Sequence, residues 1–136
     1  MSKKPRFKFH HIGIATNSLK DEIIHYSLLD YKMENNIFKD SIQGIRGCFM
    51  TKNSNRIEIL ENLPKSNKLK NLTKDGSNIY HTAYLTNNIY SAINFLINNK
   101  NKLIVRPVKS IAFNNRLICF LINNNKIITE LISTNE

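Results

Sequence analysis

Two stretches of the chain follow one pattern: HIGIATNSL at residues 11–19 and HTAYLTNNI at residues 81–89. Each stretch begins with His, alternates like a β-strand and reaches a Thr-Asn pair. A capping residue follows, Ser18 or Asn88, and opens a helical pattern of apolar side chains. The same strand-to-helix unit is therefore written twice in this chain.

The two halves also end alike. Cys48-Phe49-Met50 in the first half corresponds to Cys119-Phe120-Leu121 in the second. Each triplet is followed by a short polar turn, KNSN or NNNK, and then by a strand, at residues 56–60 or 128–132. Asn-rich turns between apolar strands indicate hairpins. Each half therefore predicts the order strand, helix, strand, strand, strand.

The helical patterns predict which side chains face the core. These positions recur every three or four residues, as on one face of a helix. They are Leu19, Ile23, Tyr26 and Ser27, with Ile24 widening the stripe, and then Ile89, Ala92, Ile93 and Leu96.

The repeat predicts an α+β fold, with two βαβββ modules forming a curved mixed sheet around a cleft. We expect the first module at about residues 6–60 and the second at about 78–133. Residues 61–77 are polar, contain Pro64 and Gly76, and are predicted to be a linker. The length of 136 residues suits a single domain, 1–136.

Composition narrows the class of protein. A hydrophobic content of 41% favours a folded chain, and the longest apolar runs are far shorter than a membrane span. The first residues, MSKKPRFKF, are basic but lack the apolar run of a secretory signal. We therefore expect a cytoplasmic protein.

The net charge of +10 is spread along the chain. Its densest cluster, PKSNKLKNLTKDG, has no aromatic side chains on which bases could stack. A solvated basic surface that attracts anionic substrates is therefore favoured over nucleic-acid binding. The two cysteines, Cys48 and Cys119, are not paired in a C-x-x-C motif and are expected to be small buried side chains rather than zinc ligands.

One imidazole and one carboxylate recur at matching positions of the two halves. Alternation along the strands places His11 opposite Ile12 and Ile14, and Glu58 opposite Ile57 and Ile59. His81 and Glu130 occupy the equivalent positions in the second half. Taken singly, such residues are more often structural or solvated. Their recurrence favours one site for a divalent metal ion, Co²⁺, Ni²⁺, Mn²⁺, Fe²⁺ or Zn²⁺. His10 and His25 have no matching partners and are not predicted ligands.

Several segments resemble the vicinal oxygen chelate superfamily, which includes glyoxalase I, methylmalonyl-CoA epimerase, extradiol dioxygenases and bleomycin-resistance proteins. The resemblance covers about residues 7–133 and is strongest to methylmalonyl-CoA epimerase-like proteins. The segments that carry it are HHIGIA at 10–15, GIR at 44–46, IEILE at 57–61, YHTAY at 80–84 and TELI at 129–132.

This resemblance implies a metal bound by His11, Glu58, His81 and Glu130, and a small-molecule carbonyl substrate. It implies proton abstraction beside the carbonyl, with Glu130 or Glu58 as the base. Some epimerases carry a further acid in the third strand, but residues 44–48 here contain no carboxylate. Arg116 either pairs with an anionic substrate or is an ordinary surface arginine.

Three functions remain open at this point. The first is a metal-dependent epimerase or isomerase. The second is a glyoxalase I-type lactoylglutathione lyase, because the two-His, two-Glu set also resembles the ligands of bacterial glyoxalase I. The third is a non-catalytic binding or resistance protein. Relatives are often dimers, so a homodimer is expected, with the site formed within one chain or across two.

Overall fold

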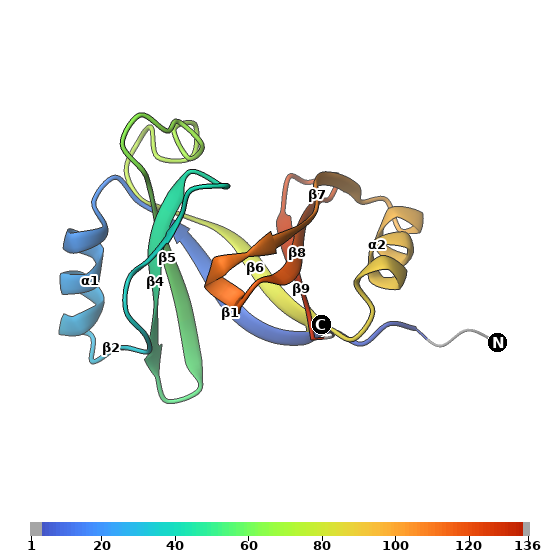
Figure 1. The fold of residues 1–136 in the computed structure, drawn as a ribbon, viewed down its shortest axis with the longest axis horizontal. Coiled ribbons are helices and arrows are strands. Elements are labelled where there is room, and N and C mark those ends of the chain that lie inside the picture. Colours follow the sequence, from blue (N-terminus) through green and yellow to red (C-terminus); the bar gives the residue numbers. More distant parts are fainter. Residues whose placement is uncertain (1–3, 135–136) are drawn as a thin grey trace. The chain divides into compact units, whose positions relative to one another are not determined.

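The computed structural model describes residues 4–134. They divide into two compact units. One unit spans His11–Tyr80, and the other combines residues 4–10 with residues 81–134. Each unit contains a mixed sheet with one helix on one face (Figure 1). The predicted α+β fold with two βαβββ modules is confirmed.

The first module has an edge strand in two pieces. Its elements are β1 (Lys8–Ala15), α1 (Leu19–Leu28), β2 (Lys32–Met33), β3 (Phe38–Asp40), β4 (Ile45–Lys52) and β5 (Asn55–Asn62). Strand β5 pairs parallel with β1 and antiparallel with β4. Both β2 and β3 pair with β4, towards its two ends, so residues 34–37 interrupt what was expected as one strand.

The second module repeats this order. Its elements are β6 (Asn78–Thr86), α2 (Ile89–Asn98), β7 (Lys102–Ser110), the 3₁₀ turn η1 (Ile111–Phe113), β8 (Arg116–Ile122) and β9 (Ile128–Ser133). Strand β9 pairs parallel with β6 and antiparallel with β8. The pairing of β7 with β8 shifts register on both sides of Val105. Pro107 lies in the second of these shifts, as expected for a residue that has no N–H to give to the ladder.

Both helices begin at the predicted capping residues. The Ser18 hydroxyl accepts a hydrogen bond from the Asp21 amide at 3.2 Å, and the Asn88 side chain accepts one from the Ser91 amide at 3.0 Å. These contacts satisfy amides that have no partner within the helix. Within the described residues, neither helix is long and apolar enough to cross a membrane.

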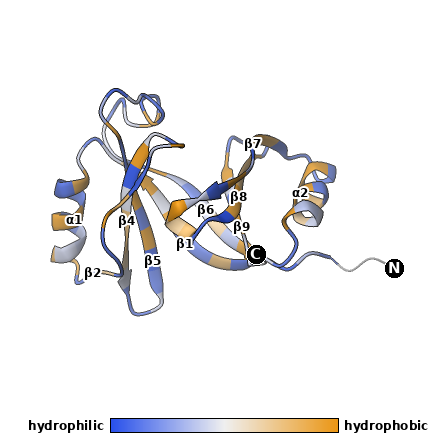
Figure 2. Ribbon diagram, viewed as in Figure 1, coloured by the Kyte–Doolittle hydropathy of each residue, from blue (hydrophilic) through white to orange (hydrophobic). Residues whose placement is uncertain are grey.

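Each helix covers an apolar face of its own sheet. Hydrophobic and hydrophilic residues alternate along the strands, as the colour changes in Figure 2 show. The core beneath α1 is formed by Ile14, Leu19, Cys48, Met50, Ile57 and Ile59. The core beneath α2 is formed by Ile89, Ala92, Ile93, Cys119, Leu121 and Leu131. All predicted core positions of α2 lie in or against its core, whereas Ile24 and Ser27 of α1 are exposed, so the expected stripe on α1 was too wide.

The segment between the modules packs on the first module. Strand β5 continues through Glu61 and Asn62, two residues assigned to the linker by the sequence analysis. Farther along, Leu69 is 4% exposed and packs in a cluster with Ala15, Ile45 and Leu60. The linker thus contributes a side chain to a core of the first module.

Candidate functional site

The first predicted pair, His11 and Glu58, is brought together in the first module. In the parallel pairing of β1 with β5, Glu58 lies directly opposite Gly13, two residues beyond His11 on the same face. The Nε2 atom of His11 lies 3.1 Å from the Oε1 atom of Glu58. Both residues are buried, at 0% and 3% exposed, on the sheet face opposite the core beneath α1.

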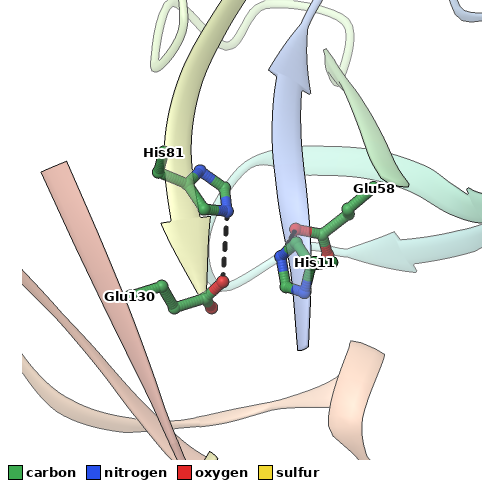
Figure 3. A group of neighbouring side chains, drawn as sticks. All are labelled: His11, Glu58, His81 and Glu130. Atoms are coloured by element: carbon green, nitrogen blue, oxygen red, sulfur yellow. Dashed lines mark ion pairs between the residues drawn. The ribbon is translucent and has the colours of Figure 1, made fainter. Parts of the chain in front are cut away.

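The second predicted pair, His81 and Glu130, repeats this geometry in the second module. Glu130 lies opposite Ala83, again two residues beyond the histidine. The Nε2 atom of His81 lies 3.2 Å from the Oε1 atom of Glu130 (Figure 3). Both residues are buried. The two modules therefore match in residue type, strand register and contacting atoms.

Small residues lie beside both carboxylates. The residue directly across from Glu58 is Gly13, and the one across from Glu130 is Ala83. Neither side chain extends beyond a methyl group, so neither competes with the histidine for contact with the carboxylate. Gly13 and Ala83 are visible in the sequence, but only the strand register shows that they lie opposite the two glutamates.

An aromatic ring lies beside each pair, a feature that was not predicted from the sequence. Phe49 lies directly across β4–β5 from Glu58, and Phe120 lies directly across β8–β9 from Glu130. The rings of Phe49 and His11 have centroids 5.4 Å apart and planes at 72°. For Phe120 and His81 the values are 5.4 Å and 82°. Both contacts are T-shaped, an arrangement that aromatic rings prefer.

The two cysteines belong to the cores on the other faces of the sheets. Burial, and then the charge of Glu58, raises the pKa of the Cys48 thiol to about 11. Burial, and then the charge of Glu130, raises the pKa of the Cys119 thiol to about 12. Metals bind the thiolate form, which these shifts disfavour. The prediction that both cysteines are small buried side chains is confirmed.

Three other residues were considered in the sequence. His25 is exposed on α1. His10 packs against Phe113, with ring centroids 5.6 Å apart. Arg116 begins β8, and alternation along that strand places it on the face that carries Phe120.

Each pair offers metal-binding atoms of two kinds. An imidazole nitrogen and a carboxylate oxygen are both common ligands of first-row divalent ions. The histidines meet carboxylates inside the protein, where an unpaired charge would be unfavourable. The donor chemistry of both pairs therefore fits a divalent cation.

Comparison with known families identifies the class of this protein. The model of the Glyoxalase/Bleomycin resistance protein/Dioxygenase superfamily matches residues 10–120, well over half of the chain. The chain therefore belongs to this superfamily, as the sequence resemblance indicated. No curated protein sequence matches it significantly.

Solved structures share the fold across nearly the whole chain. A hypothetical protein from Bacillus halodurans C-125 is 27% identical, with a TM-score of 0.80, covering 98% of this chain and 97% of that one. Mycobacterium tuberculosis methylmalonyl-CoA epimerase is 21% identical, with a TM-score of 0.78 and coverages of 95% and 89%. A Streptomyces coelicolor methylmalonyl-CoA epimerase variant in complex with 2-nitronate-propionyl-CoA is 18% identical, with a TM-score of 0.73 and coverages of 95% and 98%. At these identities the two epimerases establish similarity of fold.

Proposed function

We propose that this protein is a divalent-metal-dependent enzyme that moves a proton beside a carbonyl group, as an epimerase does. His11, Glu58, His81 and Glu130 together would hold one metal ion. The observation that carries the proposal is the matched pair of buried His–Glu contacts, at 3.1 and 3.2 Å, in the same register of both modules. The match favours a shared purpose because the buried imidazole and carboxylate are kept in both copies of the module.

The charges of the four residues support a divalent ion. Two neutral imidazoles and two carboxylates together carry two negative charges, which a doubly charged cation neutralises. Co²⁺, Ni²⁺, Mn²⁺, Fe²⁺ and Zn²⁺ all accept this mixture of nitrogen and oxygen ligands. When bound, such an ion supplies Lewis-acid polarisation of a substrate carbonyl, which makes the neighbouring C–H more acidic.

Glu58 and Glu130 are the proposed proton carriers. A carboxylate takes the proton from the carbon beside the carbonyl and returns it to the other face or to the adjacent carbon. Both carboxylates are nearly fully buried, so little water competes with the substrate for that proton. Residues 44–48 offer no alternative carboxylate, and Arg46 within them is paired with Glu61. The two glutamates therefore serve both as ligands and as bases.

We propose an acyl-CoA or another anionic carbonyl metabolite as the substrate. Support comes from the two epimerases of the same fold, one of which was solved with a CoA ligand. The net charge of +10 favours the approach of anions. Arg116, on the same face of β8 as Phe120, is the proposed partner for a substrate anion.

Solvent-deuterium exchange tests the reaction directly. Incubation of the Co²⁺-loaded protein with methylmalonyl-CoA in D₂O is expected to exchange the hydrogen beside the thioester carbonyl. Glu58→Gln or Glu130→Gln should abolish this exchange, whereas His25→Ala, which alters an exposed histidine, should not. Activity confined to a glutathione hemithioacetal would select the glyoxalase-type lyase instead. Binding of either compound without exchange or turnover would select the non-catalytic function.

We also propose that the chain forms a homodimer. A mixture of His11→Ala and His81→Ala chains tests whether the site is completed by a second copy. If one metal site draws on two chains, the mixture should regain metal binding that each variant alone lacks. If each site lies within one chain, the mixture should bind no more metal than either variant alone. The expected cytoplasmic location stays a prediction.

A further inference from the structure

Phe49 and Phe120 occupy equivalent places beside the two histidines. In each module the sheet carries histidine, glutamate and phenylalanine on three successive strands: β1, β5 and β4, or β6, β9 and β8. Each phenylalanine lies directly opposite the glutamate and also reaches the imidazole, at 5.4 Å between ring centroids in both modules. The ring therefore contacts the histidine that the glutamate holds.

A neighbouring ring matters for the imidazole because the last torsion of a histidine side chain, χ2, has only weak intrinsic preferences. Rotation of a histidine ring about χ2 has broad minima, so the strand alone does not fix the direction of Nε2. In both modules Nε2 faces the carboxylate, and the phenylalanine ring stands at a steep angle to the imidazole, at 72° and 82°. A ring in this position obstructs rotation of the imidazole away from the carboxylate.

Phe49 is itself held in place. It is 4% exposed, and its ring centroid lies 6.0 Å from that of Phe38. Phe38 packs in turn against the cluster that contains Leu69 of the linker. Phe49, which contacts His11, is thus held by packed side chains rather than by a mobile surface residue.

We infer that Phe49 and Phe120 are positioning residues that fix the two imidazole planes and so set the affinity of the site for a metal ion. This inference rests on the proposed function, because it assumes that His11 and His81 bind metal. Residues that orient metal ligands typically change affinity by roughly 10–100-fold when they are replaced. A phenylalanine makes no hydrogen bond, so the lower end of that range is expected.

The test is a Co²⁺ titration followed by visible absorption. Phe49→Leu and Phe120→Leu should each weaken Co²⁺ binding roughly tenfold and alter the intensity of the Co²⁺ bands. Phe120→Tyr keeps the ring and should bind as the wild type does. Phe49→Met and Phe120→Met replace the Leu variants if those fold poorly.

Matched controls come from the neighbouring residues on the same strands. Met50→Ala and Leu121→Ala remove side chains that face the helix cores and lie away from the histidines. They should lower stability and leave the Co²⁺ Kd unchanged. Wild-type affinity in the Phe variants, or an equal loss in the controls, would overturn the inference while leaving the proposed function intact. A wild-type chain that binds no Co²⁺ would overturn both.

Discussion

At the scale of single residues, the two faces of each sheet carry different side chains. One face packs into the core beneath the helix, and the other carries the candidate ligands. Cys48 and Cys119 alternate with Phe49 and Phe120, so the thiols enter the cores and the rings enter the candidate site. The candidate ligands were predictable because identical residue types recur at matching sequence positions. The contacts of Phe49 and Phe120 with the histidines were not predictable, although the two phenylalanines already corresponded in the repeat. Their contacts depend on which strand lies beside which, and the sequence does not state the strand order.

The buried thiols give a prediction at this scale. With a pKa of about 11, roughly one Cys48 thiol in a thousand is ionised at pH 8, and the fraction for Cys119 is smaller still. Because the pKa is raised, the reactive thiolate grows as pH rises and is scarce near neutrality. Iodoacetamide at pH 8 should therefore leave the native protein unlabelled and label both thiols in denaturant. Mass spectrometry would contradict this account by finding stoichiometric labelling of the native protein.

At the scale of elements, the repeated strand-to-helix unit was predicted correctly because the sequence patterns that indicate it are local. A cap, an alternating strand and a helical stripe each span a few residues, and the structure places both helices directly behind Ser18 and Asn88. The interruption between β2 and β3 was not foreseen. It depends on pairing with β4, which lies farther along the chain. The burial of Leu69 was missed for the same reason, since its partners Ala15 and Ile45 are distant in sequence.

Loss of a helix cap should measurably weaken the fold. Ser18→Ala and Asn88→Ala each remove a side-chain acceptor from an amide at a helix start. Each is expected to lower the free energy of unfolding by about 1 kcal/mol in urea denaturation. Ser18→Asp keeps an acceptor and should retain stability, and Lys20→Ala at an exposed site is the control. Equal stability of Ser18→Ala and Lys20→Ala would argue against the cap.

The packed linker predicts a larger effect. Leu69→Ala removes a side chain that is 4% exposed, and should lower the free energy of unfolding by about 2–5 kcal/mol. Lys70→Ala changes the exposed neighbour and should have little effect. Urea denaturation of both variants measures the difference. A loss below roughly 0.5 kcal/mol for Leu69→Ala would mean that the linker is not part of the core.

At the scale of the whole molecule, the repeat gives each of the two modules its own pair of candidate ligands, and the proposed site needs both pairs. One module provides a single imidazole and a single carboxylate, too few to enclose a divalent ion. Two copies of the same module supply two of each from the same strand positions. The superfamily match over residues 10–120 agrees with this organisation. Substrate identity was beyond the reach of the sequence, because it depends on how loops shape the space around the donors.

Metal stoichiometry tests the central claim, that the two pairs act as one site. Isothermal titration of the metal-free protein with Co²⁺ should give one ion per chain. His11→Ala and His81→Ala, which alter different modules, should each abolish that binding, while His25→Ala should leave it unchanged. Binding of two ions per chain, or wild-type binding by either His11→Ala or His81→Ala, would contradict the account.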